Sequence, residues 1–147
     1  DLTFLALLLC VSRTGIVVAA PYYSLLKGLR SSSGAWDEPF SPERTTYQVR
    51  LSAWEPTVTV YADVDFNRYL SASDYPVVTI YGHRADYGPG KPAVHEVELG
   101  GSPLQELLRE VDIVVEPPAD IGHTAIQNDT TTYRILMSRA VDYQALL

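Results

Sequence analysis

The chain has 147 residues, a formal net charge of −7 and an apolar content of 46%. This length suits one ordinary domain with a single core, and the apolar content excludes wholesale disorder. Lys and Arg are scattered singly, so we expect no direct binding to nucleic acid, which needs grouped basic residues. The single cysteine, Cys10, cannot form an internal disulfide, so the fold does not depend on an oxidising compartment.

The N-terminal residues form an apolar arm. Residues 2–11 are almost uninterrupted apolar side chains, and a second run covers 16–20. The first run is too short to cross a bilayer and Arg13 separates the two, so a membrane span is not expected. The arm also has the make-up of a secretory signal, but Pro21 would follow the cleavage point and no basic residue precedes the run, so we expect retention. Such an arm must be buried on every face, either in its own core or in a neighbouring subunit.

The next two segments predict a short helix and an aromatic connector. Over 21–34, apolar residues recur with helical spacing between Pro21 and Gly34. Two prolines in 35–43 exclude a helix or a central strand, so Trp36 and Phe40 are expected to fill a groove on this chain or on a partner. Candidate subunit contacts are the apolar side chains of the arm and these two rings: Leu2, Phe4, Leu5, Leu7, Leu8, Leu9, Val11, Trp36 and Phe40.

Residues 45–82 carry the clearest pattern, a strict alternation of apolar and polar side chains. Two alternating runs, 47–53 and 58–66, are separated by Glu55 and Pro56, and a third strand is expected over 77–81. The Gly-Pro-Gly sequence at 88–90 predicts a turn, and with the alternation over 92–99 it predicts a hairpin from 77 to 99.

The C-terminal third predicts a second helix and two more strands. Ser102, Pro103 and Gln105 have the spacing of a helix N-terminus, and the apolar stripe that follows predicts a helix over 102–111 that covers the sheet. Strands are expected over 113–115 and 130–144. Arg139 interrupts the apolar face of the last strand, which predicts a bulge or an interface near it.

These segments together predict a mainly β fold of the α+β class. We expect an antiparallel sheet or sandwich with one or two short covering helices and an extended N-terminal arm. Residues 1–44 would form the arm, the short helix and the aromatic connector, and residues 45–147 the β-rich domain with the helix at 102–111.

Few residues suggest chemistry. His83 and His95 would lie opposite each other if the hairpin paired about Pro89, and with Asp86 they are the candidate ligands of a metal ion, against the simpler interpretation as surface residues. Asp63 and Asp65 could act as paired carboxylates, although charges on a solvated sheet face explain them as well. Asn128 begins a glycosylation sequence that matters only in a secreted chain. No motif specifies a reaction, so we expect no catalytic residues, no cofactor and no enzyme activity.

The apolar arm, the aromatic connector and ten tyrosines favour a subunit of an assembly. In general make-up the chain resembles the accessory proteins of tailed bacteriophage particles, the capsid decoration and tail-completion proteins, and no family motif supports this resemblance. It implies a non-enzymatic virion component whose homo-oligomers, trimers or rings, clamp a larger protein shell. Nine arginines against two lysines and ten prolines fit a heat-tolerant source for such a clamp. A membrane-associated accessory subunit and a small metal-dependent enzyme are the alternatives.

Overall fold

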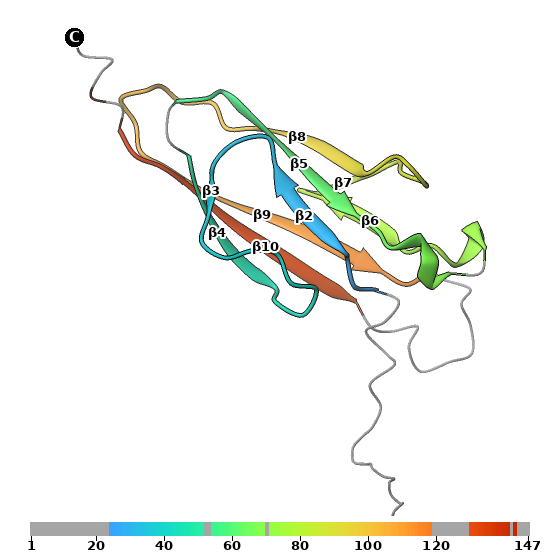
Figure 1. The fold of residues 1–147 in the computed structure, drawn as a ribbon. Coiled ribbons are helices and arrows are strands. Elements are labelled where there is room, and N and C mark those ends of the chain that lie inside the picture. The colour runs from blue at the N-terminus through green and yellow to red at the C-terminus, as the bar shows by residue number, and fades with distance from the viewer. Residues whose placement is uncertain (1–23, 52–53, 70, 119–129, 142, 144–147) are drawn as a thin grey trace, which may run out of the picture.

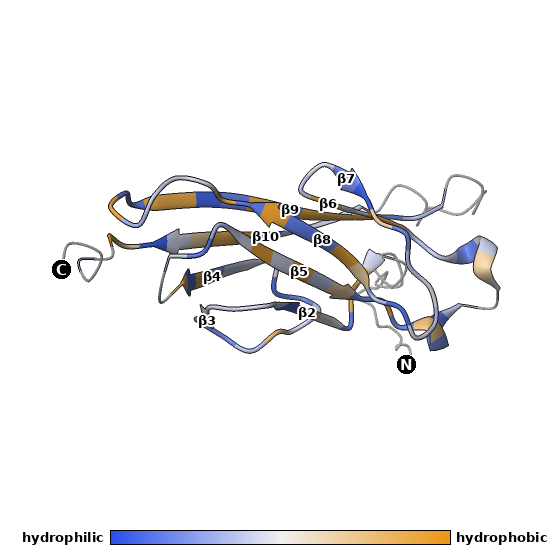
Figure 2. Ribbon diagram, turned by 90° about the horizontal axis from the view of Figure 1, so that it is seen from above, coloured by the Kyte–Doolittle hydropathy of each residue, from blue (hydrophilic) through white to orange (hydrophobic). Residues whose placement is uncertain are grey.

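The computed structural model describes residues 24–51, 54–69, 71–118, 130–141 and 143. Within these residues two β-sheets lie face to face as a sandwich (Figures 1 and 2). The fold is mainly β, as the sequence predicts. Two single 3-10 turns, η2 (Phe66–Arg68) and η3 (Ala72–Asp74), connect β5 to β6 at one end of the sandwich.

The two sheets differ in size. The larger contains, in spatial order, β3 (Ala35–Trp36), β4 (Thr46–Leu51), β10 (Thr131–Arg139), β9 (Leu107–Glu116), β6 (Val77–Ile80) and β7 (His83–Arg84). The smaller contains β2 (Gly28–Ser31), β5 (Thr57–Asp63) and β8 (Ala93–Glu98). Neighbouring strands are antiparallel except β4 and β10, which run parallel. Residues 24–44 thus contribute one strand to each sheet.

Alternating side chains from both sheets meet in one core. The period of two predicted for the first two strands is confirmed, because every second residue of β4 and of β5 is buried and those between face outward. The inward side chains of these and the other central strands are Tyr47, Val49, Leu51, Val58, Val60, Ala62, Val78, Ile80, Val111, Ile113, Val115, Tyr133, Ile135 and Met137.

The predicted helix over 102–111 is wrong, because β9 begins at Leu107. Ser102 does accept the backbone N–H of Leu104 through its hydroxyl, at 3.3 Å, and that of Gln105 through its carbonyl, at 3.1 Å. These bonds close a turn and do not start a helix. The β-branched residues that follow favour a strand. β10 pairs with β9 from Leu107 to Val115, and β6 pairs with its second half from Ile113 to Glu116.

The helix predicted over 21–34 is also wrong in its described part, where β2 pairs with β5. Leu26 and Leu29 are buried, but in a sheet and not beneath a helix. Gly34 has a φ of +102°, and a Cβ there would lie 2.5 Å from Cγ1 of Val49. Glycine is therefore required where the chain passes from the small sheet to the large one.

The predicted hairpin over 77–99 is corrected in its pairing. β6 and β7 form a two-residue hairpin through Tyr81 and Gly82, which both have positive φ, while β8 joins the other sheet beside β5. The turn at 88–90 is present, with an isolated bridge between Gly88 and Lys91.

Arg139 is the last residue of β10, and its side chain faces inward and is only 3% exposed. The register of β10 with β4 and β9 is regular through Arg139, so the predicted bulge is wrong. Its guanidinium donates to the carbonyls of Glu55 at 2.8 Å and Gly100 at 3.1 Å, which flank the strands of the small sheet. The side chain therefore joins the two sheets at one end of the sandwich.

Two buried tyrosines anchor the connector between β3 and β4. The hydroxyl of Tyr47 donates to the carbonyl of Ser41 at 2.8 Å and accepts its N–H at 2.9 Å. The hydroxyl of Tyr133 donates to the carbonyl of Pro42 at 2.7 Å and accepts the N–H of Leu26 at 3.1 Å. The two hydroxyls thus attach the connector and the segment before β2 to the inner face of the large sheet.

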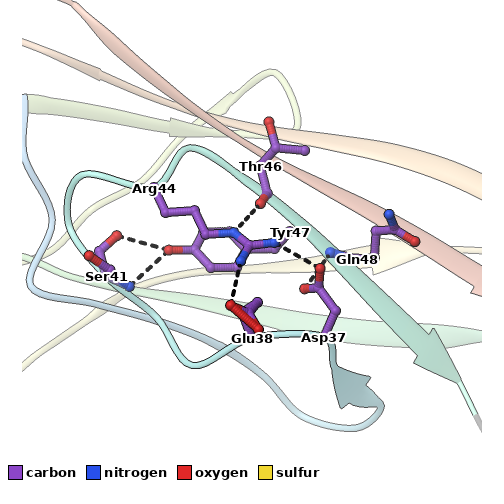
Figure 3. A network of polar contacts seen from close by, with 7 residues as sticks. All are labelled: Asp37, Glu38, Ser41, Arg44, Thr46, Tyr47 and Gln48. Atoms are coloured by element: carbon purple, nitrogen blue, oxygen red, sulfur yellow. Dashed lines mark hydrogen bonds and ion pairs between the residues drawn. The ribbon is translucent and has the colours of Figure 1, made fainter.

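Arg44 holds the outer side of the same loop (Figure 3). Its guanidinium pairs with Asp37 at 2.8 Å and with Glu38 at 2.9 Å, and donates to the carbonyl of Thr46 at 2.9 Å. The backbone N–H of Gln48, which donates to Asp37, together with Arg44 holds the pKa of the Asp37 carboxyl below its usual range. This surface network closes the loop over the tyrosines.

Replacing Tyr133→Phe is expected to lower the free energy of unfolding by about 1–3 kcal/mol, because the N–H of Leu26 and the carbonyl of Pro42 lose a buried partner. Tyr143→Phe, at a side chain with 70% exposure, is the matched control and should have almost no effect. Urea unfolding of the two variants and the parent measures the difference, and equal stability of Tyr133→Phe and the parent would contradict this role.

Candidate functional site

An open groove of about 630 Å³ lies at the end of the sandwich that carries η3. One wall is the segment from η3 into β6, and the other is the chain from β7 to the turn at 88–90. The lining residues are Ala72, Tyr75, Pro76, Val77, Arg84, Ala85, Asp86, Tyr87, Gly88 and Pro89. This volume is within the range of ligand pockets.

Tyr87 ties the two walls of the groove together. Its hydroxyl donates to the carbonyl of Pro76, and its ring lies 5.9 Å from that of Phe66, which in turn contacts the ring of Tyr75 at 4.8 Å. Burial, with the nearby hydroxyls of Tyr69 and Tyr75, raises the pKa of Tyr87 above its usual range. The hydroxyl therefore stays protonated at neutral pH and remains a donor to Pro76.

The charged groups of the groove are on its rim. The Asp86 side chain is 93% exposed and pairs with Lys91 at 3.0 Å. Arg84 is exposed and makes no ion pair with the residues that the structure describes. A ligand with a ring or an apolar group could therefore pack against the tyrosines of the groove. A hydrogen-bond acceptor on the same ligand could bind the guanidinium of Arg84.

The structure brings His83 and His95 together, by a route different from the predicted hairpin. His83 is on β7 at the edge of the large sheet, and His95 is on β8 at the edge of the small one. Their ring centroids are 4.2 Å apart with an interplanar angle of 17°. The stack therefore joins the two sheets along one side of the sandwich, with the ring of Tyr81 6.4 Å from His95.

The geometry of the two stacked imidazole rings does not suit a shared metal ion. The lone pairs of an imidazole lie in its ring plane, so near-parallel stacked rings do not direct both to one point. Asp86, the third predicted ligand, is held by Lys91. In the described part of the chain no group of three or more His, Cys, Asp or Glu is placed to hold a metal ion.

Asp63 and Asp65 have separate structural partners. Asp63 ends β5 and lies 3.7 Å from Arg30, while Asp65 follows the strand, accepts the N–H of Asn67 at the start of η2 and pairs with Arg68 at 3.4 Å. The hypothesis that they share one face of a strand is therefore wrong. Asn128 lies outside the described residues.

Trp36 and Phe40, the two aromatic candidates for subunit contacts, are partly buried and pack against the core of their own chain. The ring of Trp36 lies 5.4 Å from Tyr47, and its indole N–H donates to the hydroxyl of Ser31 at 2.9 Å. Phe40 lies 5.8 Å from Tyr47 and 5.7 Å from Tyr133. The groove that they fill is on this chain. The other candidate contacts, Leu2, Phe4, Leu5, Leu7, Leu8, Leu9 and Val11, lie outside the described residues.

The sequence interpretation missed an exposed apolar site on the large sheet. Leu108 is 75% exposed on the outer face of β9, and Leu104, in the preceding turn, is 48% exposed. Register places Ser138 opposite Leu108, so the half-buried Leu136 is its diagonal neighbour on β10. The predicted helix counted Leu108 in a buried stripe, whereas the period of two from Val111 onward places it outside.

None of the helices in the described part of the chain has the length and apolar character needed to cross a membrane. Comparison of the chain with protein-family models, with curated proteins and with solved structures finds no match.

The histidine stack should make stability depend on pH. Burial, and then the neighbouring His83, lowers the pKa of His95, so the unfolded chain binds a proton there more readily than the folded chain. Stability is therefore expected to fall as pH drops from about 7 to about 5, through the ordinary histidine range. His95→Gln should reduce this dependence, measured by urea unfolding at both pH values.

His83→Gln is the control, because it removes the neighbouring imidazole but leaves the burial of His95, which is the larger cause. It should retain part of the pH dependence. If the free energy of unfolding of His95→Gln depended on pH as strongly as that of the parent, His95 would not be the cause of the dependence.

Proposed function

We propose that the protein is a non-enzymatic structural subunit that assembles with copies of itself. The observation that carries this proposal is the exposure of Leu108 on the outer face of the large sheet, beside Leu136 and close in sequence to the exposed Leu104. Burying a leucine side chain contributes about 1.5–3 kcal/mol, which a contact between subunits would recover.

The ionisable residues of the described chain support a structural role. The carboxylates singled out from the sequence are engaged in pairs or a turn: Asp63 with Arg30, Asp65 with η2 and Asp86 with Lys91. The buried Arg139 bonds carbonyls that hold the sheets together. Arg139 thus joins the two sheets, and each of these carboxylates has a local partner.

The form of assembly that we propose is a virion component of the capsid decoration type. The resemblance in general make-up to tailed-bacteriophage accessory proteins favours a trimer or ring that stabilises a larger protein shell. In this proposal the apolar arm, residues 2–11, reaches into a neighbouring subunit, and the acidic chain makes no direct contact with nucleic acid.

The two alternative functions predicted from the sequence, a membrane-associated subunit and a metal-dependent enzyme, remain predictions. A membrane-associated accessory subunit depends on residues 2–20, which lie outside the described residues. A metal-dependent enzyme depends on His83, His95 and Asp86, and of these the structure brings only the two histidines into contact.

The native mass of the full chain in detergent-free buffer tests the proposal. We expect a discrete oligomer, and we expect Leu108→Glu to shift it toward monomer because a carboxylate is placed in the contact. Thr132→Glu is the matched control, since Thr132 is exposed on the same face at the other end of β10. Light scattering after size exclusion measures the mass. A monomeric parent, or equal loss of mass in both variants, would contradict the proposal.

Deleting residues 1–20 tests the role of the arm. The deletion leaves the described residues intact, so circular dichroism should still report a β-rich fold. The oligomer should dissociate, because the arm no longer enters a neighbour. A truncated protein that keeps the parent's mass per oligomer would remove the arm from the proposal.

A further inference from the structure

β8 is the longest edge strand in the described part of the sandwich. The other edge strands, β3, β7 and β2, have two, two and four residues, whereas β8 has six. Figure 1 shows β8 at the border of the small sheet, with β5 on one side of it. A strand in this position offers backbone groups to another chain.

The pairing with β5 fixes which groups of β8 are free. The N–H of Leu99 donates to the carbonyl of Pro56, and the register pairs Val97 with Val58 and His95 with Val60. Because backbone groups in an antiparallel pair alternate in direction, those of Val94 and Glu96 point away from β5. Neither residue has another backbone partner among the described residues. The carbonyl of Glu98 is already bonded by Arg109 at 3.0 Å, which limits the open edge to 94–96 and the N–H of Glu98.

The side chains beside this open edge are acidic. Glu96 and Glu98 are exposed and make no ion pair within the described residues. Their cross-strand neighbours on β5 are the uncharged Thr59 and Thr57. Val94, on the same face, is 42% exposed. A second copy of β8 would bring four glutamates into one short ribbon, where like charges destabilise pairing. A strand with basic side chains opposite the glutamates would complement them.

We infer that the open edge of β8 binds an extended segment of another protein, with Lys or Arg at alternating positions. The segment adds a fourth strand to the small sheet through the backbone of Val94 and Glu96, and its basic side chains pair with Glu96 and Glu98. The site is on the sheet opposite to Leu108, so it does not rest on the proposed self-assembly.

Amide hydrogen exchange of the full chain tests the inference, with a capped peptide of about eight alternating lysine and valine residues as the probe. Binding should slow exchange at Val94 and Glu96 by about tenfold or more, because both amides gain a partner. A peptide of alternating glutamate and valine should give no protection. Protection by both peptides alike, at other residues only, or by neither would overturn the inference.

Two sets of variants locate the contact. Glu96→Pro removes an N–H that points away from β5, so it should block the peptide without removing a bond of the sheet. The double variant Glu96→Gln and Glu98→Gln keeps every backbone group and should weaken binding about fivefold, as two exposed ion pairs would. If Glu96→Pro disturbs the fold, the double variant alone tests the contact. An unchanged affinity of the double variant for the lysine peptide would overturn the proposed basic partner.

The native mass of the same variants separates this inference from the proposed function. Substitutions at β8 should leave the oligomer unchanged, and Leu108→Glu should leave peptide protection at Val94 unchanged. Loss of peptide binding with Leu108→Glu would show that the two surfaces are one, and would overturn the assignment to β8.

Discussion

The position of β10 between β4 and β9 is the constraint on which the described fold depends. β10 bonds β4 in parallel and β9 antiparallel, so it joins the first long strand of the chain to the last third. Its inward side chains Tyr133, Ile135 and Met137 are fully buried in the centre of the core. At its two ends, Tyr133 anchors the connector and Arg139 bonds the small sheet, so a single strand organises both layers.

Alternation in the sequence was enough to predict the mainly β fold and the buried faces of β4 and β5, because a period of two has one structural meaning. It was not enough for β9, where Leu104, Leu107, Leu108 and Val111 fit a helical stripe and Ser102 fits a cap. A strand forms because β10 pairs with β9 along almost its whole length and β6 pairs with its second half, and this tertiary pairing is not visible in a local window. The same error concealed the exposed Leu108.

The candidate sites could be predicted only in part. The spacing of His83 and His95 about Pro89 suggested that they meet, yet they meet across two sheets, which depends on the hairpin at Tyr81 and Gly82. The groove at Tyr75 and Tyr87 and the open edge of β8 arise from the order of strands, which no residue spacing encodes. Leu108 and the acidic edge of β8 are on different sheets, so the two proposed contacts, one with copies of the chain and one with a basic partner, would not compete for one surface.

The parallel pair of β4 and β10 also has a consequence for how the chain folds during synthesis. Tyr47 and Ile135 are partners in the ladder although they lie near opposite ends of the described chain. Pairings between such distant residues form slowly, since a long loop must close before any contact stabilises it. Until β10 has been synthesised, β4 and β9 each lack the strand that lies between them, so the large sheet is completed only when this last strand is available.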